Sequence, residues 1–265
     1  MFFMIISCTS LKKIVKSEIR NEISDTLRIK LNEVYSEKDF DRLPVQLRSF
    51  LKAAGYIGKP KESNLQIIYD KAQIKIDVSS KWKKIVCDHL LFSNPHVRIV
   101  YLKAYLLGII PFEGRDRYKA GHGNMLGMVA KLIKIFDVSD REMNQSALVT
   151  YLSEILFLPS ACLSDGITWQ QINKNSIKAT IVDNGLTGTG IFHFNDAGQF
   201  IKFTTDDRFE GRISRPWIVK FEDYKNFNGY YLPSKGIATW KYPDYEFEYF
   251  IAHLKDFKYN FSAQK

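Results

Sequence analysis

The fold is decided by the stretch Gly190-Ile-Phe-His-Phe-Asn-Asp-Ala-Gly-Gln-Phe-Ile-Lys-Phe-Thr204. Aromatic and β-branched residues flank Asn195-Asp-Ala-Gly198, where the glycine can adopt a positive φ angle. This pattern predicts two antiparallel strands joined by a tight turn. Residues 217–240 repeat it around Asn228-Gly229, and residues 247–251 alternate between apolar and polar in one more strand. The last third of the chain is therefore predicted to be an antiparallel meander with one buried face.

A helix is predicted between this meander and the strands that precede it. Ser139-Asp-Arg-Glu142 has the spacing of a capping box, and Pro159 marks the end of the apolar pattern. Its apolar stripe consists of Met143, Ala147, Leu148, Tyr151, Leu152, Ile155 and Leu156. One helix inserted between strand-rich segments is expected to pack across the inner face of the sheet. We therefore predict an α+β fold: a large curved antiparallel sheet, similar to a half-barrel, with helices across its concave face and further helices at the N-terminus.

The N-terminal part is predicted to be helical. Residues 11–35 carry apolar side chains three and four positions apart with charged ones between them, the pattern of an amphipathic helix. Its basic flank faces either a membrane surface or water, and the sequence leaves both open. A second, short helix begins near Pro44 and ends at Gly55. We predict a helical extension over residues 1–40 and a single sheet-and-helix domain over residues 41–265.

Two strands before the capped helix are predicted to differ in burial. In Lys71-Ala-Gln-Ile-Lys-Ile-Asp-Val78 every second residue is apolar, which predicts a strand with one buried face. The strand at residues 97–107 is apolar on both faces, which carry Val97, Ile99 and Tyr101 on one side and Val100, Leu102 and Ala104 on the other. Such a strand lies either between a helix layer and another surface or along an apolar cavity.

The net charge of +9 is unevenly distributed, because the whole basic excess lies before residue 140. A basic surface suits a nucleic acid or an anionic membrane. The chain has no zinc-ligand spacing, no RNA-binding signature and no helix-turn-helix pattern, so nucleic acid is not expected as a partner. No apolar run approaches the roughly 18 residues that a membrane-spanning helix needs.

The cysteines and the N-terminus leave the compartment open. Ile5-Ile-Ser-Cys8 resembles the lipobox of a bacterial lipoprotein, but the apolar run before it is shorter than the roughly 7 to 15 residues of a signal peptide. Lipidation of Cys8 is therefore not expected. A disulfide between Cys87 and Cys162 requires an oxidising compartment, which nothing in the sequence establishes. The bacterial cytoplasm and the cell envelope both stay open as locations.

The densest polar cluster is Arg115-Asp-Arg-Tyr118, followed by His122. One interpretation is a hydrolase-type enzyme in which Arg115, Asp116 and His122 work together. On a strand, however, Arg115 and Arg117 point to one face and Asp116 to the other, which favours a plain ion pair at the sheet edge. In a binding role, one of these arginines would hold an anionic head group through bidentate hydrogen bonds.

No catalytic residue, metal site or cofactor is predicted. Gly121-His-Gly-Asn-Met-Leu-Gly127 lacks the Lys-Ser/Thr of a phosphate loop, and the five histidines have no metal-ligand spacing. Glu154 follows Tyr151 on or beside the stripe of the capped helix, where pairing with an arginine is expected. The candidate ligand-binding residues are Arg115, Arg117, His122, Tyr151, Glu154, Trp169 and His193.

Several segments carry a family resemblance: Leu43-Pro-Val-Gln-Leu-Arg-Ser-Phe-Leu-Lys-Ala-Ala-Gly-Tyr-Ile-Gly58, Gly114-Arg-Asp-Arg-Tyr118, Tyr151-Leu-Ser-Glu154, Ile191-Phe-His-Phe194 and Phe221-Glu-Asp-Tyr224. Over about residues 43–260 the chain resembles a widespread bacterial family of unknown function, whose members often carry an N-terminal membrane helix. That resemblance implies no activity. The closing strands are also similar to the half-barrel of Lol-type lipoprotein carriers, which implies a curved sheet, helices across its concave face and room for an acyl chain.

The leading hypothesis is a non-catalytic protein that binds an apolar or lipid-like ligand in a cavity of the curved sheet. One form of this hypothesis places the protein at the cell envelope. The hydrolase described above is one alternative. A structural or partner-binding domain is another, and it is favoured if Tyr151 and Leu152 fill the concave face without a void.

Overall fold

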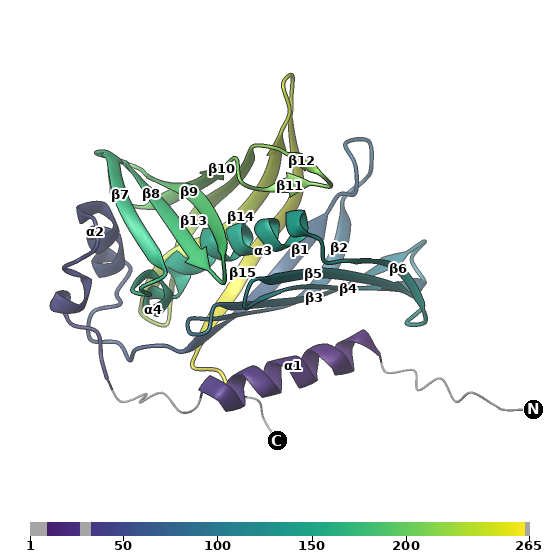
Figure 1. Ribbon diagram of the computed structural model, residues 1–265, viewed down its shortest axis with the longest axis horizontal. Coiled ribbons are helices and arrows are strands. Elements are labelled where there is room, and N and C mark those ends of the chain that lie inside the picture. Colours follow the sequence, from purple (N-terminus) through teal and green to yellow (C-terminus); the bar gives the residue numbers. More distant parts are fainter. Residues whose placement is uncertain (1–9, 27–32, 263–265) are drawn as a thin grey trace, which may run out of the picture.

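A thirteen-stranded antiparallel sheet dominates the fold (Figure 1). The computed structural model describes residues 10–26 and 33–262. Across the sheet the strands are ordered β6-β5-β4-β3-β2-β1-β15-β14-β13-β10-β9-β8-β7, and β11 pairs with β12 separately. Their bounds are β1 (Asn64–Ile74), β2 (Lys83–Phe92), β3 (Val97–Leu106), β4 (Ile110–Lys119), β5 (His122–Val129), β6 (Ile133–Val138), β7 (Ile167–Asn173), β8 (Ser176–Asp183), β9 (Leu186–Phe194), β10 (Phe200–Thr205), β11 (Phe209–Glu210), β12 (Ile213–Ser214), β13 (Trp217–Phe227), β14 (Tyr230–Lys241) and β15 (Glu246–Tyr259).

The strand order requires a helical connection across the sheet. β6 and β7 follow one another in the sequence but form the two opposite edges, while β1 and β15 pair in the middle. The segment between the edges contains α3 (Arg141–Glu154), a 3-10 turn η2 (Ile155–Phe157) and α4 (Pro159–Cys162). Figure 1 shows α3 lying inside the curve of the sheet, and it contacts β4, β5 and β9. The predicted curved antiparallel sheet with helices across its concave face is confirmed.

The capped helix begins one residue later than the sequence pattern suggests. Asp140, not Ser139, is the N-cap, and its Oδ1 accepts a hydrogen bond of 2.8 Å from the backbone N–H of Met143. The carboxylate satisfies an N–H group that has no partner within the helix. The helix therefore starts at Arg141.

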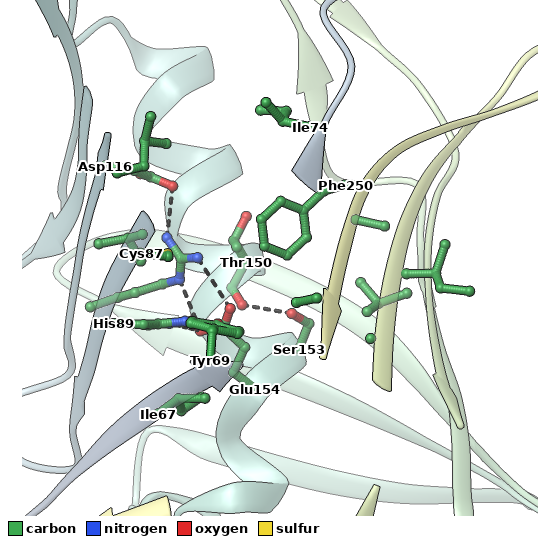
Figure 2. Close-up of a pocket in the computed structure, with 18 of the residues that line it drawn as sticks. Ile67, Tyr69, Ile74, Cys87, His89, Asp116, Thr150, Ser153, Glu154 and Phe250 are labelled. Carbon is green, nitrogen blue, oxygen red and sulfur yellow. Dashed lines mark hydrogen bonds and ion pairs between the residues drawn. The ribbon is translucent and has the colours of Figure 1, made fainter. Parts of the chain in front are cut away.

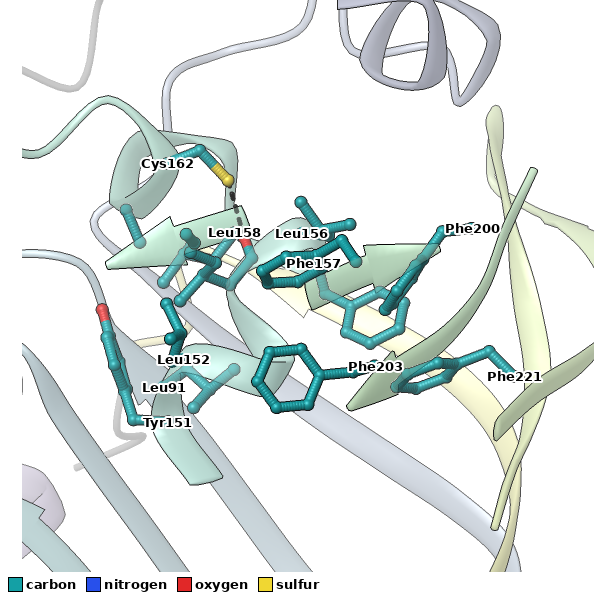
Figure 3. Packing of buried hydrophobic residues seen from close by; sticks show 14 of the residues in the cluster. Leu91, Tyr151, Leu152, Leu156, Phe157, Leu158, Cys162, Phe200, Phe203 and Phe221 are labelled. Atoms are coloured by element: carbon teal, nitrogen blue, oxygen red, sulfur yellow. Dashed lines mark hydrogen bonds between the residues drawn. The ribbon is translucent and has the colours of Figure 1, made fainter. Parts of the chain in front are cut away.

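A tightly packed aromatic core fills the space between the end of this helix and the strands of the last third. Figure 3 shows Phe157 beside Phe221 and Phe200, with ring centroids of Phe200 and Phe221 4.6 Å apart. Gly190 belongs to the stretch that decides the fold, and a Cβ atom at this position would collide with the ring of Phe203. The glycine therefore allows the hairpin predicted at residues 190–204 to pack its phenylalanines into this core.

The N-terminal helix α1 (Leu11–Thr26) covers the convex side of the sheet, opposite α3 (Figure 1). Its residues Val15 and Ile23 pack in one cluster with Ile99 and Tyr101 of β3. Docking on the sheet thus accounts for its apolar stripe. The part of the predicted helix over residues 27–32 lies outside the described residues, as does Cys8. Over residues 10–26 and 33–262, no helix combines the length and the apolar character that crossing a bilayer requires.

Two short helical elements pack into the main core through Phe40, Leu47 and Phe50. They are η1 (Glu37–Phe40) and α2 (Val45–Ala53). Pro44 precedes α2, and Gly55 follows it with φ 85°, as the predicted helix end requires. A Cβ atom at Gly55 would lie 2.5 Å from the carbonyl oxygen of Gly229, so this position needs glycine for its close approach to the β13–β14 turn as well as for its backbone angle.

The prediction of a strand over residues 71–78 is partly wrong. β1 ends at Ile74, and the next residues form the connection to β2. Ile76 and Val78 are 67% and 55% exposed there instead of facing the core. Alternation alone does not show where pairing stops, and Ile74 already pairs with Lys83, the first residue of β2. The division of the chain at residue 40 stays a prediction.

Candidate functional site

A cavity of about 180 Å³ lies between α3 and the concave face of the sheet. β1 to β5 form one wall, α3 and η2 another, and β13 to β15 the third. Most of the lining is apolar, as Ile67, Ile74 and Phe250 illustrate in Figure 2. The other apolar lining residues are Val100, Leu102, Met125, Phe157, Trp217, Val219, Phe221, Ile237, Ala238, Ala252 and Leu254.

The position of β3 explains why residues 97–107 are apolar on both faces. Ile99 and Tyr101 pack against α1, whereas Val100 and Leu102 line the cavity on the other face. Both interpretations of this strand therefore hold at once: it lies under a helix layer, and its concave side faces an apolar space.

Arg98 and Glu154 form the centre of a polar cluster on the cavity wall. Figure 2 labels Glu154, Asp116 and His89 of this cluster. Arg98 donates from Nε to Glu154 Oε2 at 2.8 Å and from Nη2 to Glu154 Oε1 at 3.1 Å. Its Nη1 donates to Asp116 Oδ2 at 2.7 Å. The Arg98 side chain is only 9% exposed, so these contacts stabilise a guanidinium that would otherwise be costly to bury.

The electrostatics of this cluster keep Glu154 ionised. Burial acts to raise its pKa, but the Arg98 guanidinium and His89 outweigh burial and hold the pKa at about 2. For Arg98, burial acts to lower the pKa, and the carboxylates of Glu154 and Asp116 raise it above its ordinary value. A carboxylate with so low a pKa and with its oxygens already hydrogen-bonded is a poor proton acceptor at neutral pH. The geometry therefore favours a structural or orienting role for Glu154.

His89 completes the cluster. Its Nε2 lies 3.0 Å from Glu154 Oε2 and its Nδ1 lies 2.6 Å from the hydroxyl of Tyr69. Burial raises the pKa of Tyr69 well above its usual value, so the hydroxyl keeps its proton and can donate it. When Tyr69 donates to Nδ1, the imidazole proton sits on Nε2 and is donated to Glu154. Both ring nitrogens of His89 thus have a partner.

A second arginine, Arg208, also lines the cavity. Its guanidinium lies against the rings of Trp217 and Trp240, at 4.4 and 4.6 Å from their centroids. Arg208 donates from Nε to Thr150 Oγ1 at 3.1 Å and from Nη1 to the hydroxyl of Tyr249 at 3.2 Å. These contacts hold the guanidinium between α3 and the strands β13 to β15.

The cluster Arg115-Asp-Arg-Tyr118 is divided between the two faces of the sheet. Arg115 donates to Glu18 Oε1 of α1 at 2.5 Å on the convex side, and Arg117 lies 3.5 Å from Glu22 Oε1. Asp116 faces the cavity on the concave side. His122 is exposed and pairs in the sheet with Lys119. The hydrolase arrangement of Arg115, Asp116 and His122 is therefore not assembled, because neighbouring residues on a strand point to opposite faces.

The remaining sequence candidates do not line the cavity, with the exception of Glu154. Tyr151 is buried in the core and donates to the carbonyl of Phe92 at 2.9 Å. Trp169 donates from Nε1 to the carbonyl of Cys162 at 3.1 Å. The ring nitrogens of His193 lie 3.2 Å from the hydroxyl of Ser176 and 3.0 Å from that of Thr204. Burial and the charge of Lys202 lower the pKa of His193 to about 4.

The cysteines and acidic side chains give no further site. Cys87 lines the cavity and Cys162 is buried elsewhere, and both are free thiols. Burial raises the pKa of Cys87 to about 12, so its thiol stays protonated at neutral pH. Within the described residues, no three His, Cys, Asp or Glu side chains gather closely enough to hold a metal ion.

Three residues of the cavity wall were not predicted from the sequence: Arg98, His89 and Arg208. Arg98 had a usable signal, because it is the one charged residue in the otherwise apolar Val97-Arg-Ile-Val-Tyr-Leu102. A charge inside a strand that is apolar on both faces requires a partner in the interior. Arg208 had no comparable signal, since it follows two aspartates in a polar segment and its tryptophan neighbours come later in the chain.

Comparison with solved structures finds one likeness to report. The crystal structure of a LolA superfamily protein from Nitrosomonas europaea is 13% identical, with a TM-score of 0.43, and the match covers 82% of this chain and 94% of that chain. The comparison with curated proteins found no match.

A sequence family matches most of the chain. The profile described as "Family of unknown function (DUF6544)" matches residues 33–252, so the predicted resemblance to a family of unknown function is confirmed. The segments quoted for that resemblance start at Leu43 and end at Tyr224, and all of them fall within the match. The protein belongs to the DUF6544 family.

Proposed function

We propose that the protein binds an apolar or lipid-like ligand in the cavity between α3 and the sheet. The observation that carries this proposal is the coexistence of a closely packed core and an adjoining space of about 180 Å³ with mostly apolar walls. Protein interiors normally leave few voids larger than a water molecule. An apolar cavity of about 150 Å³ is already large enough to bind benzene.

The size of the cavity restricts the ligand. It is smaller than the roughly 300 to 1,000 Å³ of typical small-molecule pockets. We therefore expect a small apolar group, such as a medium-length alkyl chain or flat aromatic rings. Tyr151 and Leu152 of α3 do fill part of the concave face, as a purely structural domain would require, but they pack in the core next to the cavity and leave it open. A location at the cell envelope stays a prediction.

Binding of the neutral fluorescent dye N-phenylnaphthylamine tests the proposal. We expect its fluorescence to rise on saturable binding to the wild-type protein. Gly236 lines the cavity, and a Cβ atom added there would meet nothing closer than a Phe221 ring atom at 4.0 Å. Gly236→Leu should therefore fill the cavity without disturbing the backbone and weaken dye binding by about tenfold or more.

Ala197→Leu is the matched control, because it adds an apolar side chain at an exposed hairpin turn away from the cavity. It should bind the dye as the wild type does. Extraction of the gently purified protein with organic solvent, followed by mass spectrometry, identifies any ligand retained from the cell. The proposal fails if the wild-type protein binds no dye and retains no apolar compound, or if Gly236→Leu binds the dye unchanged.

A further inference from the structure

The two arginines of the cavity differ in how their charges are balanced. Arg98 contacts the carboxylates of Glu154 and Asp116. Arg208 has no carboxylate within 4.0 Å among the residues that the structure describes. Its two hydrogen-bond partners, Thr150 and Tyr249, are neutral hydroxyls. One cation on the cavity wall is thus neutralised by the protein itself, and the other is not.

The surroundings of Arg208 hold its guanidinium in one orientation. The indole rings of Trp217 and Trp240 lie on it at 4.4 and 4.6 Å, which restricts the plane of the group by cation–π contact. A guanidinium has five N–H groups, and the contacts to Thr150 and Tyr249 use two of them. Donors therefore stay available on a cation whose position is already determined.

The hydroxyl of Tyr249 adds a further donor beside it. Its oxygen accepts hydrogen bonds from Arg208 Nη1 at 3.2 Å and from Trp217 Nε1 at 3.0 Å. With both contacts made to the oxygen, the hydroxyl proton is free to point to a third group. Tyr249 lines the same cavity as Arg208, so this proton and the unused guanidinium N–H groups can serve one bound group.

We propose that Arg208 and Tyr249 bind the oxyanion head group, a carboxylate or a phosphate, of an amphiphile whose apolar tail occupies the cavity. This inference rests on the proposed function and specifies its ligand class. A guanidinium binds carboxylate and phosphate oxygens through paired, charge-assisted hydrogen bonds. An uncharged apolar ligand would leave Arg208 without a counter-charge beside the apolar lining.

Competition between ligands that share one alkyl chain tests the assignment. Decanol, decanoate and decyl phosphate are titrated against the protein loaded with N-phenylnaphthylamine. We expect the wild type to prefer at least one of the two anions over decanol by about tenfold or more. The anion that binds more tightly distinguishes a carboxylate from a phosphate ligand. The preference should decline as ionic strength rises.

Arg208→Gln removes the charge, and Arg212→Gln is the matched control, because Arg212 is exposed and does not line the cavity. We expect Arg208→Gln to lose the preference for anions while its affinity for decanol changes little. Arg212→Gln should keep the preference. If Arg208→Gln fails to fold, Tyr249→Phe serves as the test instead. We expect this variant to show a reduced preference for anions over decanol, and an unchanged preference overturns the proposal.

The outcomes separate this inference from the proposed function. If the wild type binds no dye and retains no apolar compound, the proposed function fails and the head-group site fails with it. If the dye binds and decanol competes as well as both anions do, the cavity site stands and the head-group assignment is overturned. An anion preference that survives in Arg208→Gln also overturns it, since the charge would then come from another group.

Discussion

Arg98 Nε and Nη2 donate to the two carboxylate oxygens of Glu154 at 2.8 and 3.1 Å, across the concave side of the sheet. The two residues are 56 positions apart in the sequence. Arg98 lies on β3 and Glu154 is the last residue of α3, so the pair joins the crossing helix to one half of the sheet. This contact also borders the cavity, which makes the stability of the site depend on it.

Removal of Arg98 is expected to destabilise the fold. Arg98→Met would leave Glu154 and Asp116 without their cation, and breaking a buried ion pair in this way costs about 3 kcal/mol or more in free energy of unfolding. Urea unfolding followed by circular dichroism measures the change. Arg212→Met removes the same charge from an exposed hairpin and should change the free energy by less than about 0.5 kcal/mol. Equal losses in the two variants would contradict the prediction.

The pKa of Glu154 predicts a loss of stability in acid. Burial acts to raise this pKa, but Arg98 and His89 hold it at about 2, below the ordinary value of 4.5. As the pH falls, the unfolded chain takes up the proton first, so ionised Glu154 stabilises the fold above about pH 4.5 and its contribution declines towards about pH 2.

We therefore expect the difference in unfolding free energy between the wild type and Glu154→Gln to be largest near neutral pH and to shrink from about pH 4.5 downwards. Urea unfolding of both proteins at several pH values measures it. A difference that stays constant across this range would show that the charge of Glu154 is not what the variant removes.

The burial of Glu62 predicts the opposite dependence of the unfolding free energy on pH. It is 3% exposed; Tyr35 donates its hydroxyl to Oε2, whereas Oε1 has no partner among the described residues. Burial raises the pKa of Glu62 to about 7 from an ordinary 4.5, so the folded state keeps the proton to higher pH than the unfolded chain does. Stability should therefore fall as the pH rises from about 4.5 to about 7.

Glu62→Gln keeps the shape of the side chain and removes the titration. We expect the variant to gain stability relative to the wild type as the pH is raised through this window, measured as the difference in unfolding free energy at about pH 5 and about pH 8. The prediction is wrong if the two proteins show the same dependence on pH.

Two glycines near the end of α2 allow the stability cost of backbone strain to be measured separately from the cost of steric crowding. Gly55 and Gly58 both have positive φ, at 85° and 78°. A Cβ atom at Gly55 would lie 2.5 Å from the Gly229 carbonyl oxygen, whereas one at Gly58 would meet nothing within 4 Å. Gly58→Ala should cost about 1 kcal/mol for backbone strain, and Gly55→Ala about 1 to 3 kcal/mol more. Thermal unfolding compares the two, and equal costs would exclude the crowding effect.

Most of the fold was predictable because its signals are local. The hairpin at residues 190–204 became β9 and β10, and the capped stripe after Ser139 became α3. The opposite faces of Arg115 and Asp116 also followed from the strand period alone. The errors concern boundaries: Ile76 and Val78 continue the alternation past the end of β1, since alternation contains no information about where the partner strand stops.

The site was predictable only in small part. Among the predicted ligand-binding residues only Glu154 lines the cavity, and its expected pairing with an arginine is seen with Arg98. Asp116, predicted only as part of a hydrolase site, also lines it. Arg208 depends on Trp217 and Trp240, whose positions follow from the pairing of β13 with β14. No spacing in the sequence announces such a contact, because it is made between strands and not along one.

Local patterns in the sequence define the elements, their inward faces and the need for a helix across an antiparallel sheet, since alternation and helical period act over a few neighbouring residues. Which elements meet depends on the tertiary structure: the pairing of β1 with β15 joins the first strand along the chain to the last, and α3 crosses between the outer edges. The cavity is the volume that this packing leaves unfilled. Its polar groups come from distant strands, and no local pattern encodes a space between them.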